Sequence, residues 1–300
     1  MSSLRLWYDK PASQWVEALP IGNGLMGGMV FGGTDTERIQ LNDGTLWSGA
    51  PKEWNNPGAL AALPEIRRLV NEGKYFEADA VSKRMMGPYT ESFLPLGNLY
   101  IDFPGGGDAT GYVRSLNLDS AIASTVFTRD GARYVRDVFA SYPDGVIVVR
   151  ITADRKGAVS FVARLDSLIR HTTAASGGML VLSGRAPSSV RPDYLSDSEP
   201  VKYEDSGAKA GMEFDLRIGV AAEGGRTRAD ADGIHVDGAD AATIVIASAT
   251  GFNGYDRPPG TQGRNPAPVA EKKLNNALSK GYSELLARHL RDYRRLFRRV

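Results

Sequence analysis

Residues 121–141 have the sequence AIASTVFTRDGARYVRDVFAS, which is typical of two paired β-strands. Two runs rich in β-branched and aromatic residues flank Asp130-Gly131. Glycine accepts the positive φ that a tight hairpin turn requires, and such runs favour strands. We therefore predict strands over residues 121–129 and 133–141, joined as a β-hairpin.

The same pattern continues beyond this hairpin, from about Asn98 to Thr250. Further short runs suited to strands, separated by turn residues, lie at 145–153, 158–165, 179–184, 212–222, 233–236 and 241–250. So many strands with little helix between them favour sheet packed on sheet. The sequence therefore predicts a mainly β protein, a large antiparallel β-sandwich of the supersandwich type.

A short helical insert interrupts this pattern at about residues 56–86. Asn56 offers a cap, and Pro57 and Pro64 suit first-turn positions. A second short helix is expected from Lys74, ended by Gly87-Pro88.

After a Pro/Gly-rich loop at 253–268 the apolar period becomes helical. One stripe contains Tyr282, Leu285, Leu286, His289, Tyr293, Leu296, Phe297 and Val300. We expect a sandwich domain over 1–260 and a C-terminal α-helical linker over 261–300. Because an amphipathic helix must bury its apolar face, we expect the stripe to pack on a further domain.

Composition excludes several classes of function. Thirty-six Lys and Arg residues against 35 Asp and Glu residues leave a net charge of +1, which favours neither nucleic acid nor an anionic membrane as partner. The sequence has no cysteine and three widely spaced histidines, so we expect no metal site and no cofactor. The first residues form no apolar leader, and we expect a cytoplasmic protein unless an export signal has been removed.

The arginines of the last helical segment are explained as the solvent-exposed face of a helix. Cations are favoured near a helix C-terminus, and no aromatic residues are interleaved with them for base stacking. We therefore interpret this segment as a solvated helix face and not as a nucleic-acid-binding arm.

Residues 22–27 contain a literal G-x-G-x-x-G motif. In a dinucleotide-binding fold this motif follows a strand and opens a helix, and we expect neither element here. A glycine-rich, strand-like run follows at 28–33. The glycines are then explained by a packed strand corner or by a loop held against a ligand.

All four tryptophans lie within the first 54 residues: Trp7, Trp15, Trp47 and Trp54. Flat aromatic faces cover the C–H faces of a sugar, and amides and carboxylates bind its hydroxyls. Together with Asn23, Asn42, Asp43 and Ser48, the tryptophans therefore suit carbohydrate contact. The alternative is that each tryptophan belongs to the sandwich core, because tryptophan is highly buried on average.

Two further segments of the chain carry a family resemblance. The first runs from Leu6 to Gly33, and the second, at 37–49, is ERIQLNDGTLWSG. Together they resemble glycoside hydrolase family 95, the α-L-fucosidases. Shorter matches at 95–99, 139–143, 183–187 and 285–297 extend the resemblance over essentially the whole chain. The second segment departs from the family at Asp43 and Gly44, where a glutamate and an acidic residue are usual, so direct reach of Asp43 to a ligand is in doubt.

The resemblance implies an N-terminal sandwich and helical linker that precede an (α/α)6 barrel and a C-terminal β domain. It implies an inverting hydrolase that releases α-L-fucose from oligosaccharides or glycans; α-L-galactosides also fit, because the two sugars differ only at C6. The family's acid and base lie in the barrel, so we expect no catalytic residue here and no activity from this chain alone.

The resemblance also implies the partners, a fucosylated glycan and the barrel. We expect Asn23, Asn42, Asp43 and Trp47 to lie on the pocket wall where the domains meet, with a role confined to the domain interface as the alternative. Two other functions stay open, a stand-alone carbohydrate-binding module and a purely structural sandwich.

Overall fold

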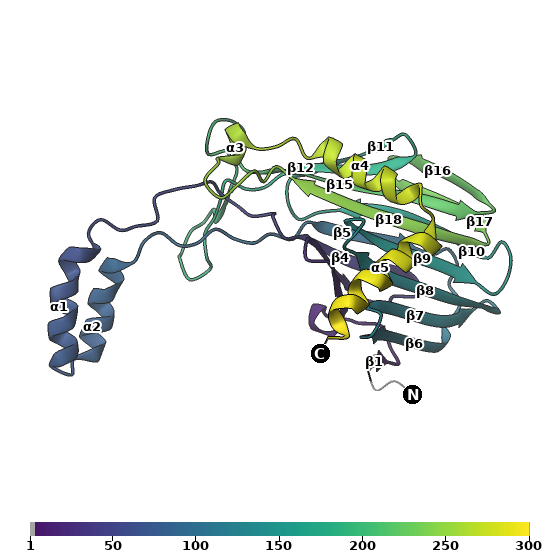
Figure 1. Ribbon diagram of the computed structural model, residues 1–300, viewed down its shortest axis with the longest axis horizontal. Coiled ribbons are helices and arrows are strands. Elements are labelled where there is room, and N and C mark those ends of the chain that lie inside the picture. Colours follow the sequence, from purple (N-terminus) through teal and green to yellow (C-terminus); the bar gives the residue numbers. More distant parts are fainter. Residues whose placement is uncertain (1–3, 300) are drawn as a thin grey trace.

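The computed structural model describes residues 4–299, and its body is a pair of antiparallel sheets (Figure 1). The nine-stranded sheet has the spatial order β1 (Arg5–Tyr8), β6 (Thr110–Asn117), β7 (Ile122–Arg129), β8 (Ala132–Ser141), β9 (Val146–Ala153), β18 (Ala241–Thr250), β15 (Glu213–Glu223), β12 (Met179–Arg185) and β11 (His171–Ser176). The seven-stranded sheet has the order β16 (Arg226–Asp230), β17 (Gly233–Ala239), β10 (Val159–Asp166), β5 (Gly97–Asp102), β4 (Thr36–Asp43), β3 (Met26–Val30) and β2 (Leu19–Gly22). The predicted large antiparallel sandwich is confirmed.

The main core lies between the two sheets. Along β7, β10 and β4, buried residues alternate with more exposed ones, as expected where one face of a strand is covered. β18 differs, because nine of its ten residues are buried. Both of its faces must therefore be covered, one by the second sheet and the other by something outside the sandwich.

That outer cover is formed by helices α4 (Ala267–Leu278) and α5 (Tyr282–Phe297). Leu274, Ala277 and Leu285 form a second apolar cluster with side chains of β8, β9 and β18. Figure 1 shows both helices crossing the face of the large sheet. The sandwich therefore buries Leu285 and His289 of the apolar stripe without a further domain, whereas Leu296 is 49% exposed. Packing of the rest of the stripe on a further domain stays a prediction, and Val300 lies outside the described residues.

The helical insert is an arm that extends away from the sheets on two long connections (Figure 1). It consists of α1 (Ala59–Asn71), α2 (Tyr75–Ser82) and a 3-10 turn (Lys83–Met85). The Asn56 amide donates to the carbonyls of Arg84 and Met86 at 2.8 and 3.0 Å, which fastens the two ends of the insert together.

Two details of the insert differ from the prediction. Gly58, and not Asn56, is the residue that precedes α1, and the Asn56 side chain accepts a hydrogen bond from the Gly58 N–H at 2.8 Å. Pro64 lies inside α1 beyond its first turn, where its missing N–H leaves one helical hydrogen bond unmade.

Two glycine-containing turns were addressed by the sequence predictions, one at Asp130-Gly131 and one at residues 22–27. Asp130 and Gly131 both have positive φ, 50° and 72°, and join β7 to β8 as the predicted hairpin. The G-x-G-x-x-G segment also forms a hairpin, because β2 ends at Gly22 and β3 begins at Met26. A strand does precede this motif, contrary to our expectation, but a strand and not a helix follows it.

The connections of the sandwich hold three small elements. They are a 3-10 turn (Trp15–Glu17), the two-stranded ribbon of β13 (Ser189–Val190) and β14 (Val201–Lys202), and the short helix α3 (Pro259–Gln262). In Figure 1, α3 lies at the end of the sandwich from which the arm departs.

Candidate functional site

The four tryptophans all lie on the surface. Between 42% and 63% of each residue is exposed, so the alternative that they belong to the sandwich core is wrong for every one of them. Trp47 and Trp54 line a common cavity. Exposed aromatic groups beside a concave surface are typical of ligand or partner contact.

The loop that carries Trp47 is held in place by backbone hydrogen bonds. Trp47 forms an isolated β-bridge with Phe93, and the two rings lie 5.4 Å apart between centroids. The Ser48 N–H donates to the Ser92 carbonyl at 2.9 Å, and the indole N–H of Trp47 donates to the Gly44 carbonyl at 3.2 Å. The indole is therefore presented from a fixed backbone.

The cavity beside Trp47 has a volume of about 270 Å³ and is built from segments far apart in the sequence. Its aromatic lining consists of Trp47, Trp54, Phe252 and Tyr255, and its polar lining includes Ser48, Glu91, Asn253 and Arg257. These residues come from the loops that follow β4, precede β5 and follow β18. One apolar cavity with a few convergent polar groups is the usual form of a small-molecule site.

Lys52 organises one wall of this cavity. Its ammonium lies 2.7 Å from the Glu91 carboxylate, 4.5 Å from the ring centroid of Trp54 and 5.2 Å from that of Tyr89. An ammonium over an aromatic face is attracted by the ring quadrupole. Lys52 therefore contacts both Trp54 and Glu91 and fixes their positions relative to each other.

Two of the predicted wall residues, Asn23 and Asp43, have their polar groups engaged within the chain. The Asn23 amide donates to the Ser141 carbonyl at 3.0 Å, and its oxygen accepts from the Leu25 and Met26 N–H groups. The Asp43 carboxylate is buried beneath the Trp47 loop. It accepts hydrogen bonds from the Thr45 N–H at 3.0 Å, the Thr45 hydroxyl at 2.7 Å and the Ser248 hydroxyl at 2.7 Å.

The four predicted wall residues do not meet in one place. Trp47 lines the cavity just described, whereas Asn23 lines a separate cavity of about 410 Å³ beside Tyr142 and His289. Asn42 is half-buried on β4, on the face of the sheet opposite to that of Asp43. Their contact with substrate stays a prediction.

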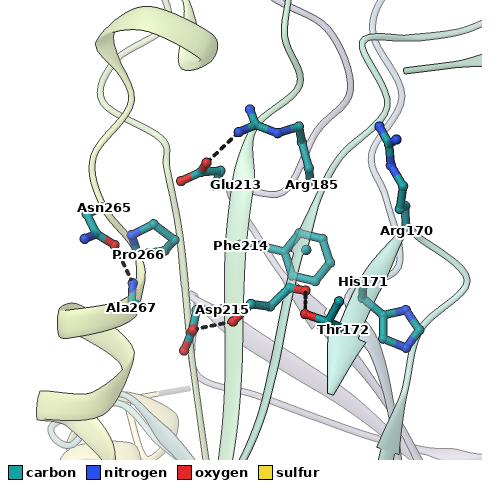
Figure 2. Close-up of a pocket in the computed structure, with 12 residues that line it drawn as sticks. Arg170, His171, Thr172, Arg185, Glu213, Phe214, Asp215, Asn265, Pro266 and Ala267 are labelled. Carbon is teal, nitrogen blue, oxygen red and sulfur yellow. Dashed lines mark hydrogen bonds and ion pairs between the residues drawn. The ribbon is translucent and has the colours of Figure 1, made fainter. Parts of the chain in front are cut away.

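A third cavity, of about 410 Å³, lies between β11, β12, β15 and the start of α4 (Figure 2). Figure 2 shows Arg185 directed at Glu213, and the two side chains form an ion pair of 2.5 Å. Asp215 accepts from Arg217 at 2.6 Å and from the Ser183 hydroxyl at 2.9 Å. Because both carboxylates are occupied by partners, this cavity holds no free acid or base pair.

The carboxylic acids with a raised pKa are structural. Burial raises the pKa of Glu37 against the opposing effect of Arg136, and burial raises the pKa of Asp137. Neither residue lines any of the three cavities. Raised carboxyl pKa values outside a cavity do not define a general acid for a sugar substrate.

Residues 4–299 contain neither a cluster of three metal-ligand side chains nor a helix suited to span a membrane. No three His, Asp or Glu side chains in that range gather as ligands for a metal ion. None of the helices in the described part of the chain has the length and apolarity needed to span a bilayer.

Two packed antiparallel sheets with helices on the outer face of the larger sheet define the class of β-sandwich domains. Residues 6–255 match the family described as Glycosyl hydrolase family 65, N-terminal domain, and the chain belongs to that family. A solved structure titled Putative kojibiose phosphorylase from human microbiome superposes on 97% of this chain and 37% of its own, with a TM-score of 0.53 and 9% identity, which shows the fold alone.

Curated relatives agree with the resemblance found in the sequence. The chain is 30% identical to Alpha-L-fucosidase 2 of Arabidopsis thaliana over 99% of this chain and 36% of that protein. It is 29% identical to Probable alpha-fucosidase A of Aspergillus niger over 97% of this chain and 37% of that protein. The resemblance to the α-L-fucosidases of family 95 is confirmed, and the chain spans little more than a third of these relatives.

Several residues of the Trp47 cavity were not identified from the sequence. Glu91, Met212, Phe252, Tyr255 and Arg257 line it but belong to no signature segment that we singled out. The one available signal was the placement of two aromatic residues at the start of the Pro/Gly-rich loop. That signal does not indicate which other loop the aromatic residues face.

Proposed function

We propose that the protein that carries this chain is a glycoside hydrolase that releases α-L-fucose from oligosaccharides or glycans. The observation that carries the proposal is the 30% identity to Alpha-L-fucosidase 2 over 99% of this chain. α-L-Galactosides are the second substrate class, since they differ from α-L-fucosides only at C6. Location in the cytoplasm stays a prediction.

The proposed mechanism is hydrolysis with inversion at the anomeric carbon. One carboxylic acid protonates the leaving oxygen and a base activates water on the opposite face of the sugar, with the two groups about 6.5–9.5 Å apart. In the cavities described above, Glu213 and Asp215 are held by arginines. The resemblance to the α-L-fucosidases of family 95 implies that the acid and the base lie in an (α/α)6 barrel in the remainder of the protein, and we assign no catalytic residue to this chain.

The role proposed for this chain is to carry loops that line the sugar site. In support, the Trp47 loop is fixed by the buried Asp43 carboxylate and by the β-bridge to Phe93. The Trp47 indole is therefore held in a fixed position although it is exposed and does not contribute to the core. A scaffold of this kind needs no titratable group of its own at the reacting bond.

The test compares the native polypeptide with the 300-residue chain on an aryl α-L-fucoside and on a fucosylated oligosaccharide. We expect the native polypeptide to release L-fucose and the isolated chain to release none. Proton NMR of the first product should show the β-anomer, as inversion requires. The α-anomer as first product would contradict inversion, and no release of fucose from either substrate would contradict the proposed function.

A stand-alone carbohydrate-binding module is the second candidate. One observation favours it, since the exposed aromatic side chains of Trp47, Trp54 and Tyr255 line one cavity that also has polar groups. This candidate predicts sugar binding without turnover by the native polypeptide.

A further inference from the structure

Four aromatic side chains gather around one cavity at the end of the sandwich beside α3. Trp47, Trp54 and Phe252 are 41–44% exposed, and Tyr255 is 89% exposed. Exposing this much aromatic surface in one place opposes the hydrophobic effect, so a ligand that covers it would be bound favourably.

The cavity is organised before any ligand arrives. The bridge between Trp47 and Phe93 fixes one indole, and the Lys52 ammonium lies over the ring of the other, that of Trp54. Trp54 is 44% exposed, so part of its surface is available to a ligand. A site whose rings are already ordered loses little conformational entropy on binding.

Polar groups for hydroxyls lie beside these rings. The Glu91 oxygens accept one hydrogen bond each, from Ser48 at 2.9 Å and from Lys52 at 2.7 Å. A carboxylate oxygen has two lone pairs, so each still has capacity for a sugar hydroxyl. Arg257 lines the cavity as well, and its guanidinium carries five N–H donors.

An apolar part of the lining distinguishes among sugars, and the amide of the polar lining residue Asn253 is already hydrogen-bonded to Gln262 and Arg264. Met212, Phe252 and Pro259 contribute to the wall, and the Glu91 charge is balanced by Lys52. A methyl group at C6 of a hexose packs against such a wall, whereas a hydroxymethyl group would place a hydroxyl there that needs a hydrogen-bond partner. A neutral sugar with one extended apolar edge matches this combination.

We infer that this cavity is a carbohydrate-binding site contained within the sandwich, and that its ligand is a terminal 6-deoxyhexopyranoside, the L-fucoside. The inference rests on the proposed function for the identity of the sugar. The pyranoside stacks between Trp47 and Trp54, its hydroxyls reach Glu91 and Arg257, and its C6 methyl lies on the side of Met212 and Phe252.

The test titrates the 300-residue chain with methyl α-L-fucoside, followed by isothermal titration calorimetry and by tryptophan fluorescence. We expect saturable binding with a Kd on the order of 1 mM, as is common for one small neutral ligand with few contacts. Methyl α-L-galactoside should bind roughly tenfold more weakly, since an apolar pocket rejects an added hydroxyl only modestly.

Three variants locate the site. W47A and W54A should each weaken binding about tenfold or more, which corresponds to about 1.4 kcal/mol. Y255A provides a variant that cannot disturb the core, because Tyr255 is 89% exposed, and it should weaken binding at least threefold, roughly 0.6 kcal/mol. W7A is the matched control: Trp7 is 63% exposed on β1, outside this cavity, and the variant should bind as the parent chain does.

The results of these experiments distinguish the proposed carbohydrate-binding cavity from the proposed hydrolase function. Absence of saturable binding, or equal binding by W47A, W54A, Y255A and the parent chain, would overturn the site. Equal affinity for the galactoside would overturn the 6-deoxy preference. Fucoside hydrolysis by the native polypeptide without binding by the chain refutes the cavity alone, and binding without hydrolysis refutes the proposed hydrolase alone.

Discussion

Removal of the Asp43 carboxylate should destabilise the sandwich and release the Trp47 loop. Asp43 is 1% exposed, and its carboxylate accepts three hydrogen bonds, from the N–H and hydroxyl of Thr45 and from the hydroxyl of Ser248 on β18. A hydrogen bond to a charged group contributes about 1.5–3 kcal/mol net, and three bonds to one side chain are not additive. We therefore expect Asp43→Ala to lower the free energy of unfolding by about 3–5 kcal/mol.

Urea unfolding measures this loss as a lower midpoint at a constant m value. Asp43→Asn, which keeps one acceptor oxygen and the shape, should fall between the parent chain and Asp43→Ala. The control is Asp108→Ala at an exposed position, which should stay within about 0.5 kcal/mol of the parent chain. If the free energy of unfolding of Asp43→Ala also lay within about 0.5 kcal/mol of that of the parent chain, the Asp43 carboxylate would not be what fixes this loop.

Three further changes test the packing of the helices. Leu285 is 1% exposed under α5, so Leu285→Ala should cost about 2–5 kcal/mol in urea unfolding, and an unchanged midpoint would contradict the docking of α5 on the sheet. Phe76 is 92% exposed on the arm, so Phe76→Ser should leave the free energy of unfolding within about 0.5 kcal/mol; a larger loss would mean that the arm is covered in solution. Burial lowers the pKa of His289 below its usual 6.5. Below pH 6.5 the unfolded chain therefore binds more protons at this histidine than the folded chain does. The stability that is present above pH 6.5 is lost as the pH falls. His289→Gln should flatten this fall between pH 7.5 and 5.5 in thermal unfolding, and an identical slope would remove His289 as its source.

The buried, alternating strands were predictable from the sequence because burial imposes a period on them. β18 coincides with the predicted strand at 241–250, and β7 and β8 differ from theirs by one residue at one end. β11 and β16 were not predicted, because both are edge strands with mostly exposed or half-buried residues. An edge strand with little apolar surface carries no period-two signal.

The placement of the tryptophans was not predictable in the same way. Composition favours burial for any tryptophan, and only the tertiary structure shows that Trp47 is fixed by Phe93, a residue 46 positions away, while its ring stays exposed. The packing of α5 on the outer face of the large sheet was not predicted, for a related reason. The outer face of β9 and β18 is apolar, but a continuous apolar strand does not indicate which helix packs on it.

The two signature segments predicted the family because they fix backbone geometry and not chemistry. Asn23 closes the β2–β3 turn, and Asp43 ties the Trp47 loop to β18. Residues with such roles are specific to the fold whether or not they touch a sugar. The cavity itself draws on loops near positions 50, 91, 212 and 255, whose meeting is a property of the folded sandwich.

The proposed function makes the claim that this chain is one domain of a larger fucosidase-type hydrolase whose acid and base lie elsewhere in the polypeptide. The intact mass of the native polypeptide, measured on material purified by its α-L-fucosidase activity, tests it most directly. We predict a mass well above the 32.3 kDa of the 300 residues. An active protein with a mass of 32.3 kDa would contradict the claim, because the carboxylates of this chain would then have to perform the hydrolysis.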